Sequence, residues 1–173
     1  MSGSLVHLYQ QLHRSNKGYG GGPGPVVLQA LREFVKGMYV KRALDWGCGN
    51  SHAITDLFPD AECVRYDPAI PGVDDLPSGF FDFGICTDVL EHIPEGELTD
   101  LFTEMYARTP RWAFVVHTGL AATILPDGQN AHCTVRSHDW WVQRIEQGFG
   151  VAAPLDIGLS ENDLRKGVTT YVV

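Results

Sequence analysis

Short apolar runs alternate with segments of helical periodicity along this chain. Apolar residues at helical spacing predict helices at residues 2–14, 25–36, 51–58, 94–108 and 137–149. Apolar runs predict strands at residues 43–45, 61–66, 81–87 and 112–117, and two more strands joined by a polar turn at 155–159 and 168–173. This alternation predicts an α/β domain with a mostly parallel central sheet and helices on both faces.

The first strand leads into a tight turn that carries an acidic residue and two glycines. Asp45 ends the strand, and Gly47 and Gly49 follow at alternate positions before a helical segment begins at Ser51. Glycines at these positions let the backbone turn sharply and leave room for a ligand, which the N–H groups of the helix start would face. The carboxylate of Asp45 suits a cationic amino group better than a pyrophosphate.

Two further segments occur in an order that makes a family resemblance specific. Asp67 ends the second strand, and the strand at 81–87 is followed by Asp88-Val89-Leu90-Glu91-His92. Together with Asp45-x-Gly47-x-Gly49, these motifs resemble those of the class I S-adenosylmethionine-dependent methyltransferases. The resemblance covers residues 43–118 closely. It implies a single Rossmann-like domain over residues 1–173, with a C-terminal antiparallel hairpin and S-adenosylmethionine as cofactor.

The resemblance also implies cofactor contacts. In this family the acid and the glycine loop hold the methionine part, so Asp45 is expected there, with helix capping as the alternative. Asp67 is expected to bind the ribose, whose two hydroxyls suit a bidentate acceptor. Asp88 stands at the mouth of its strand, where α/β sheets bind ligands. The expected cofactor-binding residues are Tyr19, Asp45, Gly47, Cys48, Gly49, Asp67, Pro68, Asp88 and Val89.

One segment departs from the family pattern. The family places a helix and a third strand after the ribose acid, but residues 67–81 are too few and contain three prolines. This helix and the third strand are therefore predicted to be missing, with the loop 69–76 forming one wall of the adenine pocket. Asp74 and Asp75 are either adenine contacts or solvated loop acids.

Residues 15–25 are rich in glycine and proline. They form either a flexible linker or a gate across the cofactor, with Tyr19 as a candidate contact. The resemblance favours the gate, because these methyltransferases often close the pocket with their N-terminal segment.

Residues 118–136 show no clear periodicity, and a loop of this length in a compact domain is usually functional or disordered. It is expected to hold the acceptor. His132 and the neighbouring His117 are candidate general bases, with loop-stabilising hydrogen bonds as the alternative. His92 is a third catalytic candidate, which either acts as a base or supports the site. Glu91 beside it is a similar candidate, with helix capping as the alternative role.

Methyl transfer from a sulfonium is a direct displacement in which the protein mainly aligns the nucleophile. No catalytic triad is required, and the sequence contains no Gly-x-Ser-x-Gly and no P-loop. The spacings among His117, His132, Cys133 and His138 match no closed zinc pattern, so no metal is expected.

The amino-acid composition bears on the binding partners and the location of the protein. The net charge of −8 over 173 residues argues against a dedicated nucleic-acid binder, which would need a basic face. The four cysteines form no CxxC pair, so reduced thiols and a cytoplasmic location are expected. No apolar stretch is long enough to cross a membrane, and the N-terminus lacks a secretory pattern.

The function expected is methyl transfer from S-adenosylmethionine to a small or exposed acceptor. One alternative is a lyase or hydrolase of S-adenosylmethionine on the same fold, and another is a non-catalytic module that binds a partner protein. A nicotinamide-dependent dehydrogenase is disfavoured, because His52 stands where that motif has its third glycine.

Overall fold

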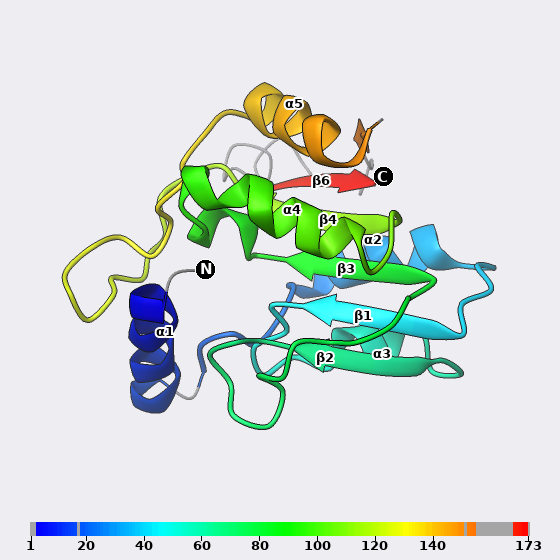
Figure 1. The fold of residues 1–173 in the computed structure, drawn as a ribbon, viewed down its shortest axis with the longest axis horizontal. Helices are drawn as coiled ribbons and strands as arrows, with labels where there is room; N and C mark the ends of the chain where they lie inside the picture. The colour runs from blue at the N-terminus through cyan, green and yellow to red at the C-terminus, as the bar shows by residue number, and fades with distance from the viewer. Residues whose placement is uncertain (1–2, 17, 151, 155–167, 173) are drawn as a thin grey trace.

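A computed structural model describes residues 3–16, 18–150, 152–154 and 168–172 of the chain, and six strands in these ranges form one sheet (Figure 1). The strands are β1 (Arg42–Trp46), β2 (Glu62–Tyr66), β3 (Phe83–Thr87), β4 (Trp112–His117), β5 (Ala153–Pro154) and β6 (Val168–Val172). Their order is β2-β1-β3-β4-β6-β5. The first four are parallel, whereas β6 is antiparallel to both β4 and β5.

The prediction of a mostly parallel sheet in an α/β domain is confirmed. The predicted loss of the family's third strand and its helix is also confirmed, because residues 67–82 contain neither, so β2 is the edge strand. The strand expected at 155–159 lies outside the described residues.

Helices cover both faces of the sheet, because alternate residues of each strand point to opposite sides. The helices are α1 (Gly3–Ser15), α2 (Pro25–Val35), α3 (Ala53–Leu57), α4 (Leu98–Tyr106) and α5 (His138–Phe149). One face buries Leu44 and Phe114 beneath α4 and α5. The other face buries Ala43, Ile85 and Val115 beneath α2 and α3.

Two helices begin later than the sequence predicts. Helix α3 starts at Ala53 rather than residue 51, because the Ser51 hydroxyl accepts a hydrogen bond from Ala53 N at 3.0 Å outside the helix. Helix α4 starts at Leu98, after 3₁₀ turns at Leu90–His92 and Glu95–Glu97. Ser137 is the N-cap predicted for α5, since its side chain accepts a hydrogen bond from Trp140 N at 3.3 Å.

Helix α1 and the loop 118–136 lie beyond the carboxyl ends of the parallel strands (Figure 1). They pack on each other through a separate apolar cluster that includes Tyr9 and Leu12 of the helix and Leu125 and Ala131 of the loop. Among the described residues, no helix has the length and apolarity that a membrane span requires.

Candidate active site

A cavity of about 480 Å³ lies at the carboxyl ends of the parallel strands. Of the site residues that the sequence predicts, those that line it are Tyr19, Gly47, Cys48, Gly49, Asp67, Pro68, Asp88, Val89, His92, His117 and His132. The sheet order fixes the sequence of groups across the cavity. Asp67 follows β2, the glycine loop follows β1, Asp88 follows β3, and His117 ends β4.

The glycine loop turns where side chains do not fit. Gly47 has φ 75°, and a Cβ atom there would lie 2.3 Å from Val89 Cγ2. Gly49 has φ 51°, and a Cβ atom would lie 2.6 Å from the carbonyl oxygen of Gly20. Only glycine combines this conformation with such close approach. The loop thus leaves its backbone exposed to a ligand on one side and to the N-terminal segment on the other.

The N-terminal segment packs directly on the glycine loop. Asn50 N donates to Gly20 O at 2.8 Å, and Asn50 Nδ2 donates to Tyr19 O at 3.1 Å. The Tyr19 ring stacks on that of Tyr9 in α1, with centroids 6.3 Å apart. These contacts place residues 19–22 along the cavity wall, where a gate would lie.

Asp67 links the glycine loop to the shortened connection after β2. Its Oδ2 accepts a hydrogen bond from Gly49 N at 2.9 Å, and its Oδ1 accepts one from Ala69 N at 2.8 Å. Each carboxylate oxygen can accept more than one hydrogen bond, so the side chain keeps acceptor capacity toward the cavity. Of the loop 69–76, only Ala69 lines the cavity, and Asp74 and Asp75 are exposed.

Asp45 is the one predicted cofactor residue that does not line the cavity. Its side chain is only 2% exposed. Burial raises the pKa of Asp45 to about 7, Asp67 adds to this effect, and the guanidinium of Arg65 opposes it. Arg65, which is partly exposed, also donates a hydrogen bond to Gly49 O at 3.1 Å and so contacts both Asp45 and the glycine loop.

The raised pKa of Asp45 predicts a pH-dependent effect of Asp45→Asn on the free energy of unfolding. The pKa of Asp45 is about 7 in the folded protein, against an ordinary value of 3.8. Protonated Asp45 therefore contributes to the free energy of unfolding fully below pH 3.8, and this contribution is lost as the pH rises through 7. The variant should therefore gain stability relative to wild type over that window, by at most about 4 kcal/mol. Urea unfolding across this pH range, with the exposed Asp60→Asn as control, would measure it. A difference that stays constant with pH would contradict the prediction.

The histidines gather at the end of the cavity near β3 and β4. His117 Nε2 lies 3.1 Å from Asp88 Oδ1, and this hydrogen bond raises the pKa of His117 against the effect of burial. Asp88 has φ 57°, a left-handed conformation that is uncommon outside glycine. The backbone N of His117 donates to Glu91 Oε1 at 2.8 Å. The segment after β3 is thereby joined to the end of β4.

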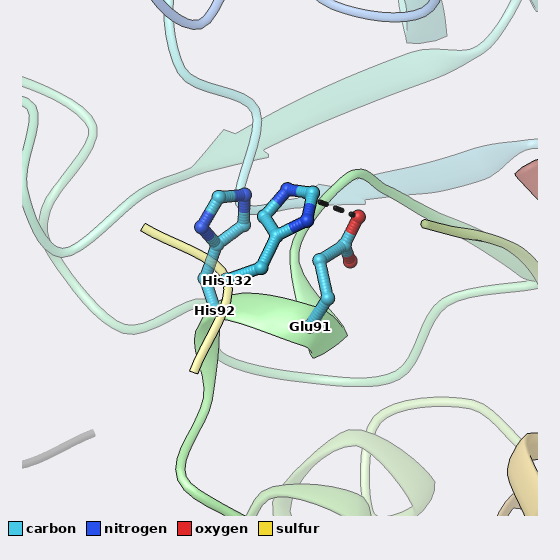
Figure 2. Close-up of side chains that lie close together, drawn as sticks. All are labelled: Glu91, His92 and His132. Atoms are coloured by element: carbon cyan, nitrogen blue, oxygen red, sulfur yellow. Dashed lines mark ion pairs between the residues drawn. The ribbon is translucent and has the colours of Figure 1, made fainter. Parts of the chain in front are cut away.

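His92 and His132 form an edge-to-face pair with ring centroids 4.7 Å apart (Figure 2). His92 Nδ1 lies 2.9 Å from Ala131 O, and His132 Nδ1 lies 2.6 Å from Gly119 O. Because a carbonyl oxygen only accepts, each Nδ1 carries the proton and each Nε2 is left as an acceptor. Burial lowers the pKa of His92 to about 4 and also lowers the pKa of His132. Both rings are therefore neutral at physiological pH.

The structure adds residues that the sequence did not assign to the site. Tyr9 and His13 of α1 line the cavity, as do Gly20–Gly22 and Thr87. Tyr9 follows Leu5 and precedes Leu12 on one helical face, a spacing that could have identified it as an inward residue. Glu91, for which capping was the alternative, is fully buried beside the histidines instead.

The fold has close counterparts among solved structures, although no protein-family model and no curated protein matches the sequence. A complex of DhpI with S-adenosylhomocysteine (SAH) superposes with a TM-score of 0.71 at 15% identity, covering 99% of this chain and 97% of that chain. The DhpI-SAM-HEP complex gives 0.70 at 15% identity, covering 99% and 98%.

A second protein gives a similar match. The Burkholderia thailandensis 1,6-didemethyltoxoflavin-N1-methyltransferase, with bound 1,6-didemethyltoxoflavin and S-adenosylhomocysteine, superposes with a TM-score of 0.67 at 10% identity. The match covers 98% of this chain and 86% of that chain. The chain therefore has the fold of class I S-adenosylmethionine-dependent methyltransferases, which confirms the resemblance at the level of fold.

Proposed function

We propose that this protein transfers the methyl group of S-adenosylmethionine to a small-molecule acceptor. The observation that carries the proposal is the order of groups along one cavity. Asp67, the glycine loop, Asp88 and then the histidines follow the sheet order β2-β1-β3-β4. A cofactor with its ribose at Asp67 and its methionine part along the glycine loop and Asp88 directs its sulfonium toward the histidines.

The charges of the cavity fit this cofactor. Its ribose hydroxyls meet the free acceptor sites of Asp67, and its ammonium lies in the field of Asp45 and Asp88. DhpI and the 1,6-didemethyltoxoflavin-N1-methyltransferase share this fold and are each bound to S-adenosylhomocysteine, which supports the choice of cofactor.

The chemistry is a direct displacement. A lone pair of the acceptor atom attacks the methyl carbon while the sulfur–methyl bond breaks, and the bonding pair stays on sulfur as S-adenosylhomocysteine forms. An acceptor that carries a proton loses it to a group nearby, and the site offers His117, His132 and His92. His117 differs from the other two because its Nε2 is hydrogen-bonded to Asp88.

The acceptor is a small molecule rather than a macromolecular surface. A cavity of about 480 Å³ lies in the size range of small-ligand sites. Helix α1 and the loop 118–136 border it, and Leu120, Ala121, Ala122 and Thr123 of that loop line it. The apolar lining of this loop faces the acceptor side, so it is the expected source of substrate specificity.

Binding of the cofactor and formation of a methylated product test the proposal. Calorimetric titration with S-adenosylmethionine and S-adenosylhomocysteine should give saturable binding. Incubation with methyl-labelled S-adenosylmethionine and a panel of small hydroxy, amino and carboxylic acceptors should then yield a labelled product by mass spectrometry.

The rival functions give different results in the same experiments. A lyase or hydrolase would consume S-adenosylmethionine without an acceptor and leave the label on a fragment of the cofactor. A partner-binding module would bind neither ligand at millimolar concentration, and that result would reject the proposal.

A further inference from the structure

A compact group of metal-ligating side chains lies at the histidine end of the cavity. Glu91, His92 and His132 place one ligand atom each within 4.8 Å of the others (Figure 2). Glu91 and His92 come from the 3₁₀ turn after β3, and His132 comes from the loop 118–136. His92 and His132 both line the cavity. Sequence spacing could not show this group, because His132 lies 40 residues after His92 in the chain.

Each histidine is held with one ring nitrogen toward the protein and the other free. His92 Nδ1 is bonded to Ala131 O, and the Tyr9 hydroxyl lies 2.8 Å from the same nitrogen. His132 Nδ1 is bonded to Gly119 O. In metal sites a histidine commonly donates its second N–H to a carbonyl, which fixes the ring and directs the other nitrogen at the ion. Both rings already have that arrangement.

Glu91 supplies a buried carboxyl group at the same place. Its side chain is fully buried, and Oε1 lies 4.0 Å from His132 Nε2 while accepting the 2.8 Å hydrogen bond from His117 N. Its Oε2 is buried and has no hydrogen-bond partner. A buried carboxylate is costly without a counter-charge, and a cation would supply one.

Hydrogen bonds fix the positions of the three proposed ligand residues. Thr134 N donates to Glu91 O at 3.0 Å, and Thr134 Oγ1 donates to Ile93 O at 2.6 Å. Asn130 Oδ1 accepts from His132 N at 3.0 Å. These bonds fix the loop that carries His132 against the turn that carries the other two ligands. A second overlapping group, formed by Asp88, Glu91 and His117, also has ligand atoms within 4.8 Å of one another and adds negative charge beside it.

We propose that Glu91, His92 and His132 bind a divalent transition-metal ion at the acceptor end of the cavity. Two imidazoles and one carboxylate suit Zn²⁺, Mn²⁺ or Fe²⁺, and three protein ligands leave coordination positions open toward the cavity. This assignment replaces the expectation of no metal, which considered His117, Cys133 and His138 with His132 and not Glu91 or His92.

The role of the ion rests on the proposed function and identifies the class of acceptor. A bound divalent ion coordinates a hydroxyl oxygen and lowers its pKa. The acceptor is then an alcohol, phenol or enol. Its proton leaves to solvent or His117, an oxygen lone pair attacks the methyl carbon, and the sulfur–methyl bond breaks. The products are a methyl ether and S-adenosylhomocysteine.

Metal binding is tested without an acceptor. The protein is treated with a chelator, desalted, and titrated with Zn²⁺ and Mn²⁺ by calorimetry and with Co²⁺ by visible absorption. One equivalent should bind, and Glu91→Gln, His92→Ala and His132→Ala should each weaken binding by at least about 100-fold. His52→Ala and Cys133→Ser remove an exposed imidazole and an exposed thiol, so they should bind like wild type.

Parallel titration with S-adenosylhomocysteine separates the two proposals. Variants that keep cofactor affinity but lose the ion are folded, and they assign the site to these three residues. Wild type that binds S-adenosylhomocysteine but no metal overturns the metal site alone. Metal binding that persists in all three variants overturns the assignment of ligands. Metal binding without cofactor binding supports the metal site and rejects the proposed function.

Discussion

Asp67→Ala is expected to weaken the binding of S-adenosylhomocysteine by at least about 100-fold, which corresponds to about 3 kcal/mol. The substitution removes the acceptors of Gly49 N and Ala69 N as well as the groups proposed to bind the ribose. Hydrogen bonds to a charged group contribute about 1.5–3 kcal/mol each, so two ribose contacts suffice for this loss. Calorimetric titration would measure the affinity, and Asp74→Ala, which removes an exposed acid of the same loop, should leave it unchanged.

A loss of affinity could also follow from a disordered glycine loop, and a double-mutant cycle distinguishes the two causes. Wild type and Asp67→Ala are each titrated with S-adenosylhomocysteine and with its 2′-deoxy analogue. If Asp67 contacts the ribose, removing the hydroxyl should weaken binding to wild type strongly and to the variant little. Equal losses in both proteins would show that Asp67 acts only through the loop.

Gly84→Ala should be the most destabilising single-methyl change in the sheet, lowering the free energy of unfolding by about 3 kcal/mol. Gly84 lies in β3 opposite Trp112 of β4, and a Cβ atom would lie 2.4 Å from two ring atoms of that tryptophan. The ring cannot withdraw, because it is fully buried and its Nε1 donates to Thr109 O at 2.7 Å. For a domain of this size, the melting temperature should fall by roughly 6–12 °C.

Thermal and urea unfolding of paired variants test this explanation. Gly96→Ala adds the same methyl group where no atom lies within 4 Å, and it should change stability by less than about 0.5 kcal/mol. Trp112→Leu destabilises the core but makes room beside Gly84. The double variant Gly84→Ala/Trp112→Leu should therefore be more stable than the sum of the two single effects predicts, by about 1 kcal/mol or more. Strict additivity would show that the two residues do not compete for the same space.

Local signals in the sequence account for most of the fold and identify several of the residues that line the cavity. Short apolar runs, typical of strands buried on both faces, and helical spacing of apolar residues predicted the parallel core, and the prolines of residues 67–81 predicted the missing strand. Asp67, Gly47 and Gly49 could be identified from the sequence because each directly follows a predicted strand, within a few residues of its end. The predicted starts of α3 and α4 were less accurate. The Ser51 side chain competes with the first turn of α3, and a 3₁₀ turn precedes α4.

The sequence by itself determined the α/β class, the glycine loop and the acid that follows β2, because each depends on neighbours within a few residues. Only the tertiary structure brought Glu91, His92 and His132 together and packed α1 and residues 19–22 over the cavity. It also buried Asp45 away from the cavity lining. The grouping of His132 with Glu91 and His92 depends on how the loop after β4 folds back on the turn after β3. Contacts between segments so far apart in the chain follow from the order of strands in the sheet and from packing, not from any local pattern.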